Sequence, residues 1–144
     1  MKNVTLTRRS LLATTALAML PVRVLAATAS PPGAKVYFIA PHNHQHVKSP
    51  FVVRFGLKGM GVTHAGDDFP NAGHHHLLID VNDALKPGEV IPSDRNHMHF
   101  GAGQSEARIE LPPGKHTLQL VLGDAEHKVF NPPVVSKKIT ITVY

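Results

Sequence analysis

The chain has 144 residues, the length of one ordinary domain, with 15 Lys and Arg, 10 Asp and Glu, 11 His and no Cys. The lack of cysteine excludes disulfides, thiol nucleophiles, iron–sulfur clusters, thiolate blue-copper sites and haem attachment through C-x-x-C-H. Any chemistry must therefore use histidine, carboxylate, methionine, hydroxyl or backbone groups. Histidine is far more abundant than in an average domain.

Residues 1–26 have the pattern of a secretory signal peptide. A basic start precedes an apolar run at residues 10–22, and the small residues at 26–29 suit cleavage. The run is too short for the roughly 20 residues of a membrane-spanning helix. The pair Arg8-Arg9 resembles the twin-arginine export signal, with the ordinary secretory route as the alternative. We therefore expect a periplasmic protein without stable membrane insertion.

The basic charge of the chain comes largely from this leader. Its removal takes away four of the 15 basic residues and none of the 10 acidic ones, which leaves a net charge near +1. All 11 histidines remain. A nucleic-acid partner is therefore not expected, because the basic surface that it would need is missing from the remaining chain.

Residues 27–144 are predicted to form one all-β domain. Short segments with β-branched, aromatic or alternating residues are separated by proline and glycine, and no segment after residue 30 has a helical period. The predicted strands are 35–39, 51–57, 74–81, 107–111, 116–122 and 139–143. With no helices to cover a parallel sheet, this pattern indicates a single antiparallel β-sandwich, immunoglobulin-like or Greek-key. Phe55, Ile79, Leu120 and Ile141 are predicted to be buried.

The first histidine cluster lies in the predicted strand 74–81. Side chains alternate across a strand, so one face, predicted to be the core face, carries His75, Leu77, Ile79 and Val81. His74 and His76 point to the other side. At roughly 3.3 Å per residue, these two imidazoles start about 6–7 Å apart along the strand. Two imidazoles at this spacing can close onto one ion.

His97-Met98-His99 repeats the same arrangement. Met98 is expected to point inward, which places His97 and His99 together on the opposite side. Because a sandwich brings strands distant in sequence together, we expect His74, His76, His97 and His99 to converge.

Other histidines have simpler interpretations. His42, His44 and His46 lie in a polar stretch that reads as a loop, and they can either add a metal site or carry no function. His116 stands at the end of an apolar face and is interpreted as a hydrogen-bonded core or rim residue.

Four stretches, at residues 51–62, 73–80, 97–106 and 111–124, carry a family resemblance. They contain a triple histidine, H-M-H-F-G-A-G-Q-S-E and P-G-K-H-T-L-Q-L-V-L-G-D. The chain resembles a bacterial periplasmic family known as domain of unknown function 4399, whose biochemistry is unsettled. The resemblance implies these polar signature positions: Met60, His74, His75, His76, His97, His99, Gln104, Glu106, His116 and His127. The sequence departs from the family pattern at residues 42–46, where an ordinary turn is usual, and at Phe130, where a second histidine often follows His127.

The donor types favour copper, with zinc as the alternative. Imidazole suits zinc, copper and nickel, thioether favours Cu(I), and clustered carboxylates for calcium, magnesium or manganese are scarce. The predicted ligands are His74, His76, His97, His99, Met60, Met98, His42, His44 and His46. Residues expected to orient these ligands or satisfy turns are His75, Gln104, Glu106 and His127. Since an unperturbed histidine has a pKa of about 6.5, metal affinity should fall as the pH drops through that value.

These observations favour a non-enzymatic periplasmic copper protein for metal storage, delivery or tolerance, whose partners are the ion and another metal-trafficking protein. One alternative is a His-ligated hydrolase or redox metalloenzyme on a β-sandwich, with Glu106 as general base for hydrolysis. Another is a metal-free envelope-binding module with a pH-sensitive histidine network. A nucleophilic hydrolase is disfavoured, because Ser93 and Ser105 lack the G-x-S-x-G context.

Overall fold

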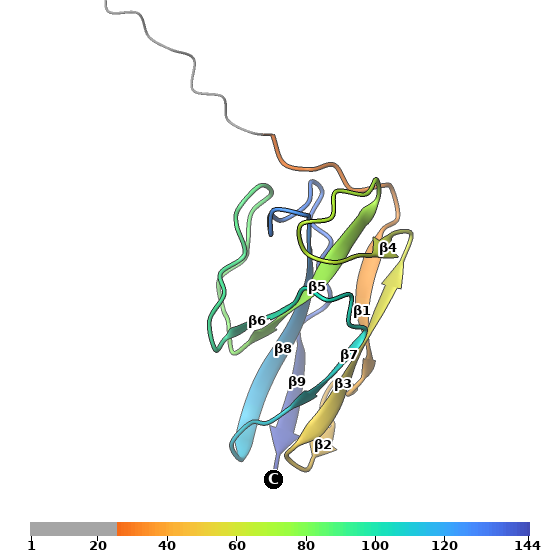
Figure 1. Ribbon diagram of the computed structural model, residues 1–144. Helices are drawn as coiled ribbons and strands as arrows, with labels where there is room; N and C mark the ends of the chain where they lie inside the picture. Colours follow the sequence, from red (N-terminus) through yellow and green to blue (C-terminus); the bar gives the residue numbers. More distant parts are fainter. Residues whose placement is uncertain (1–25) are drawn as a thin grey trace, which may run out of the picture.

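The computed structural model describes residues 26–144, which contain nine strands joined by loops and no helix (Figure 1). The strands are β1 (Lys35–Ala40), β2 (His46–Val47), β3 (Phe51–Lys58), β4 (Gly61–Val62), β5 (Ala72–Ile79), β6 (His97–Phe100), β7 (Glu106–Ile109), β8 (Gly114–Gly123) and β9 (Ile139–Val143). Within these residues there is no helix long and apolar enough to cross a membrane. The predicted leader falls almost entirely outside them.

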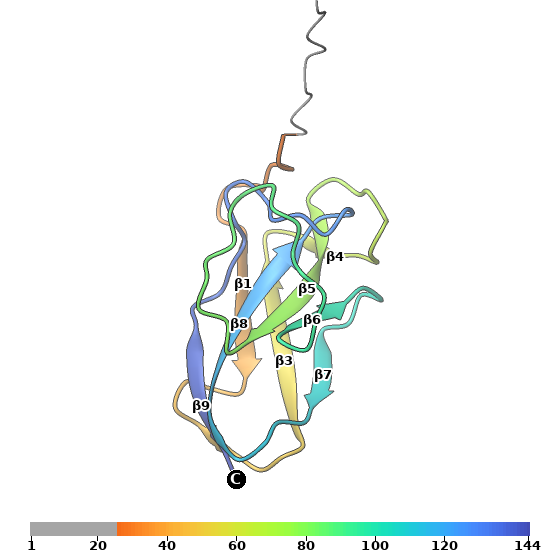
Figure 2. The same ribbon diagram turned by 90° about the vertical axis from the view of Figure 1, so that its left-hand side faces the viewer.

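The strands form two sheets. One has the order β1-β3-β7, and the other has the order β2-β9-β8-β5-β4, with β6 paired to β5. Every pairing between the longer strands is antiparallel, and only the two-residue strands β2 and β4 pair in parallel. The chain passes from β6 in one sheet to β7 in the other (Figure 2). These features confirm the predicted antiparallel sandwich.

The main core lies between the two sheets. β3 contributes the buried side chains of Val53 and Phe55, and β8 contributes those of Leu118, Leu120 and Leu122. Alternation along the strands points these five residues inward, where the burial of each large side chain stabilises the fold by about 1.5–3 kcal/mol. All four residues predicted to be buried, namely Phe55, Ile79, Leu120 and Ile141, lie in this core.

A second, smaller apolar cluster covers the other face of the β5–β8 pair. It is built from Leu78, Ile91, Val121 and Val129, and the segments 82–96 and 129–135 supply its outer members. β5 is therefore buried on both faces: every side chain from His74 to Ile79 is no more than 4% exposed. The alternation alone would leave one face of this strand open to solvent.

β5 ends two residues earlier than predicted. Asp80 has a positive φ of 57°, which is left-handed backbone and ends the extended strand. Val81 consequently packs against the second cluster rather than the main core. The strands β2 and β4 escaped prediction because two residues carry no detectable period.

His116 of β8 contacts the residue that follows β5. Its Nδ1 lies 2.7 Å from Oδ2 of Asp80 and its Nε2 lies 2.9 Å from the carbonyl oxygen of Pro112. Burial lowers the pKa of His116, but the hydrogen bonds to Asp80 and Pro112 outweigh that effect, and the pKa is raised. The interpretation of His116 as a hydrogen-bonded rim residue is confirmed.

The replacement Asp80→Asn tests this contact. Asparagine tolerates the positive φ and still accepts the Thr117 N–H, but it removes the charge that favours the imidazolium. Because the folded pKa is raised, the stabilisation is complete below the unfolded pKa of about 6.5 and is lost as the pH rises through the folded pKa. Urea unfolding followed by circular dichroism should show the variant about 1 kcal/mol or less below wild type at pH 6, and closer to it at pH 9. A difference independent of pH would contradict this account.

Candidate metal centre

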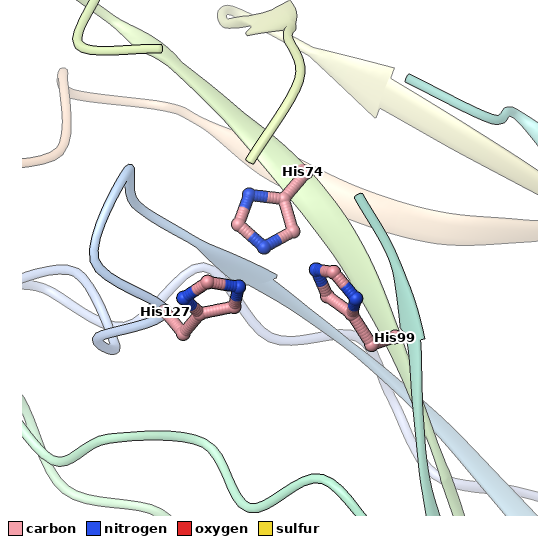
Figure 3. A group of neighbouring side chains, drawn as sticks. All are labelled: His74, His99 and His127. Atoms are coloured by element: carbon pink, nitrogen blue, oxygen red, sulfur yellow. The ribbon is translucent and has the colours of Figure 1, made fainter. Parts of the chain in front are cut away.

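Four imidazoles from three parts of the chain meet beside β5. His74 and His76 come from β5, His99 from β6, and His127 from the turn after β8. The ring centroid of His74 lies 4.7 Å from that of His76, 4.9 Å from that of His99 and 4.9 Å from that of His127. Figure 3 shows the rings of His74, His99 and His127 gathered around one space. We call these four residues the histidine cluster.

Three members of the histidine cluster have the spacing of metal ligands. One ring nitrogen each of His74, His99 and His127 lies within 4.8 Å of the others, and no other group of three His, Asp or Glu in residues 26–144 is so placed. A tetrahedral ion with metal–nitrogen bonds of about 2.0–2.1 Å needs these nitrogens about 3.3 Å apart. The exposed His99 and the turn residue His127 can supply this inward movement by side-chain rotation.

Strand register explains which histidines meet. His76 of β5 pairs directly with His99 of β6, and His74 lies two residues further along the same face. His97 pairs with Leu78, two residues away in the other direction, so its ring is displaced from the cluster by about 6–7 Å along the strand.

Two glycines make room for the rings. A Cβ atom on Gly101 would lie 2.3 Å from Cε1 of His99, and one on Gly123 would lie 2.7 Å from Cε1 of His76. Any larger residue at these positions would push the imidazoles out of place.

A tight turn delivers His127. Its backbone has a positive φ of 63°, and its N–H donates to the carbonyl oxygen of Asp124 at 3.0 Å. The Oδ1 atom of Asp124 accepts the N–H groups of Glu126 and Lys128, so the carboxylate fills the centre of the turn. Sequence reasoning assigned His127 an orienting role, whereas the structure places it among the convergent rings.

Burial sets the protonation state of the cluster. His74 and His76 are 0% and 1% exposed, and both ring nitrogens of His74 and Nδ1 of His76 have no hydrogen-bonding partner in the protein. Burial, followed by the charges of His127 and His99, lowers the pKa of His74 to about 4. Burial, followed by the charge of His74, lowers the pKa of His76 to about 3, and burial also lowers that of His99. The buried imidazoles are therefore neutral at pH 7, the form that binds cations, and protons compete at a lower pH than the ordinary value of 6.5 implies.

His75 faces the other side of β5, as predicted. Its ring packs 5.1 Å from that of Phe55, and its Nδ1 lies 3.2 Å from the backbone carbonyl oxygen of Gln104. Burial lowers its pKa. His75 thus joins the core to the loop after β6 and does not orient the rings of the cluster directly. The Gln104 side chain instead accepts the N–H of Ala102.

The structure corrects the expectation that His97 converges with the other three. Its Nδ1 lies 2.9 Å from Oδ1 of Asp94, and its backbone N–H donates to the same oxygen. Met98 and Met60 pack against the main core. Alternation along β6 turns Met98 away from His97 and His99. Neither thioether is part of the cluster.

Two further predicted groups also lie apart from the cluster. Glu106 accepts a hydrogen bond from Arg54, and the side chains of both residues are exposed. His42, His44 and His46 are exposed around β2, which lies at the opposite end of the sandwich from β4, the neighbour of β5 beside His74 (Figure 1).

The fold and the cluster define a β-sandwich with a histidine site of metal-ligand spacing beside its largest sheet. Residues 53–144 match the family described as Domain of unknown function (DUF4399), so the chain belongs to this family, as its motifs predicted. The match includes all four residues of the histidine cluster. Comparison with curated proteins and with solved structures finds no match.

The lowered pKa of His74 predicts an acid-sensitive metal-free protein. Protonation at this site favours the unfolded chain, so stability is complete above the unfolded pKa of 6.5 and falls as the pH drops towards the folded pKa of about 4. A shift of this size corresponds to about 3 kcal/mol. In urea unfolding of chelator-treated protein, His74→Gln should give a flatter dependence on pH over this range. Parallel curves for variant and wild type would contradict the prediction.

The replacement Gly101→Ala tests the space behind His99. The added Cβ would lie 2.3 Å from Cε1 and 2.5 Å from Nε2 of His99, so the exposed ring must move. Gly61→Ala is the matched control, because its Cβ would meet only the Cβ of Ala72 at 3.6 Å. Imidazole resonances in long-range ¹H–¹⁵N spectra should shift for His99 in the first variant and not in the second. Unchanged His99 resonances in Gly101→Ala would show that the ring is not held there.

Proposed function

We propose that this chain is a metal-binding protein that holds copper, with zinc as the alternative, on His74, His99 and His127. The observation that carries the proposal is the convergence of ring nitrogens at a site where His74 is fully buried and has no protein partner for either nitrogen. A buried polar group without a partner costs about 1–3 kcal/mol. A cation bound to its lone pair offsets that cost.

This arrangement favours a metal site over a metal-free histidine network. A network would pair N–H groups with ring nitrogens or carboxylates, as His116 pairs with Asp80. His74 has only neighbouring rings, at centroid distances of 4.7–4.9 Å, and no such bond. Neutral imidazoles that face one another in this way are typical of ligands around an ion.

The argument for copper depends only on the imidazole nitrogens of the cluster. With Met60 and Met98 packed in the core, the thioether argument for Cu(I) has no support. An all-imidazole set suits Cu(II), Zn(II) and Ni(II), and the Irving–Williams order makes copper the tightest binder where it is available.

The surroundings favour a carrier over an enzyme. Glu106, the general base of the hydrolytic alternative, is engaged by Arg54. His76, whose ring centroid lies 5.2 Å from that of His99, is a candidate fourth ligand that would complete a closed site. We propose a role in periplasmic metal storage, delivery or tolerance, with the exposed His99 as the ligand through which another trafficking protein exchanges the ion.

Thermal unfolding with and without added metal tests the proposal. A ligand that binds only the folded state adds about 2.7 kcal/mol of stability at a hundredfold excess over Kd. Cu(II) should therefore raise the Tm of untagged protein at pH 7.5, and a chelator should reverse the increase. The double variant His99→Ala/His127→Ala should lose the increase.

His44→Ala/His46→Ala is the matched control, because it also removes two imidazoles but leaves the histidine cluster intact. It should keep the copper response of wild type. The proposal fails if wild type responds to neither copper nor zinc, or if the control loses as much of the response as the cluster variant.

A further inference from the structure

The first described residues are bound to the segment that follows the His127 turn. Residues 27–30, which we call the N-terminal strap, run parallel to this segment: the Asn131 N–H donates to the Thr28 carbonyl oxygen at 2.8 Å, and the Ser30 N–H donates to the Asn131 carbonyl oxygen at 3.0 Å. Ser30 Oγ also donates to the carbonyl oxygen of Pro132. The strap is therefore a fixed part of the fold.

One side chain of the strap reaches the turn itself. The Thr28 hydroxyl donates to Oδ2 of Asp124 at 2.6 Å, across 96 residues of sequence. Oδ1 of Asp124 is already taken by the N–H groups of Glu126 and Lys128 at 3.0 and 2.8 Å. With both oxygens engaged and only 5% of the residue exposed, the Asp124 carboxylate has a single orientation. That orientation holds the left-handed backbone from which His127 extends.

Asp124 also affects the cluster electrostatically. Asp124 directly follows Gly123, which pairs with His74 across β5 and β8, so its negative charge lies in the strand end next to the cluster. Imidazole ligands bind a metal in their uncharged form, so they leave the charge of a bound divalent cation uncompensated. A buried carboxylate beside the site supplies part of that compensation.

We propose that Thr28 and Asp124 are positioning residues of the metal centre: the strap hydroxyl fixes the carboxylate, and the carboxylate holds His127 at the ion. This inference rests on the proposed function. Asp124 orients a ligand backbone rather than a ligand ring, which explains how a turn residue can act as a ligand beside two rigid strands.

Thr28→Val tests the proposal, because valine keeps the shape of threonine and removes only the hydroxyl. Thr28→Ser restores the donor and is the rescue variant. Ser30→Ala is the matched control, since it removes a hydrogen bond of the same strap that does not reach Asp124. Two readouts are needed, on protein that begins at residue 27 and so keeps the whole strap: Cu(II) affinity by competition with a chelator of known Kd, and amide hydrogen exchange at Glu126 and Lys128 in the metal-free protein.

Thr28→Val should weaken Cu(II) binding about fivefold, as expected for one lost hydrogen bond, and should speed exchange at both amides. Asp124→Asn should weaken Cu(II) binding about tenfold or more. Thr28→Ser and Ser30→Ala should match wild type in both readouts. Unchanged affinity and exchange in Thr28→Val, or equal losses in Ser30→Ala, would overturn the inference while leaving the proposed function intact. Absence of Cu(II) and Zn(II) binding by wild type would overturn the proposed function, and with it the metal role of Thr28, even if exchange at the turn responds to Thr28→Val.

Discussion

The burial of β5 on both faces is the constraint on which the rest of the site depends. On one face, His75, Leu77 and Ile79 enter the main core, and on the other face the second apolar cluster packs over Leu78. A strand held in this way cannot slip by one residue without exchanging its two sets of side chains. His74 and His76 are consequently kept in a low-dielectric environment, where the neutral imidazole is favoured.

Such a site reduces the stability of the metal-free protein. Buried ring nitrogens without hydrogen-bonding partners lower the stability of the fold, because nothing replaces the water that they lose on folding. Gly101 and Gly123 leave space for the rings but add no side chain to the packing there. Polar groups that weaken a fold in this manner are typical of functional sites, where a ligand completes the missing contacts. The rigid strands β5 and β6 provide three of the imidazoles, and the turn held by Asp124 provides the fourth.

Local pattern could predict the sandwich and the faces of β5, because alternation with a period of two is a property of neighbouring residues. It could not separate His97 from His99, since both share one face and only the register with His76 and Leu78 distinguishes them. The place of His127 depends on hydrogen bonds within a turn and on packing across sheets, which have no period in the sequence. The surroundings of His74 depend in the same way on distant segments, because the rings beside it include those of His99 and His127.

The proposed function requires that His74, His99 and His127 bind one ion. Anomalous diffraction at the copper edge, from crystals of protein loaded with one equivalent of Cu(II), tests it most directly. We expect one strong peak about 2.0–2.1 Å from a ring nitrogen of each of these three residues. A peak at His42, His44 and His46 instead, or no ordered copper near β5, would contradict it.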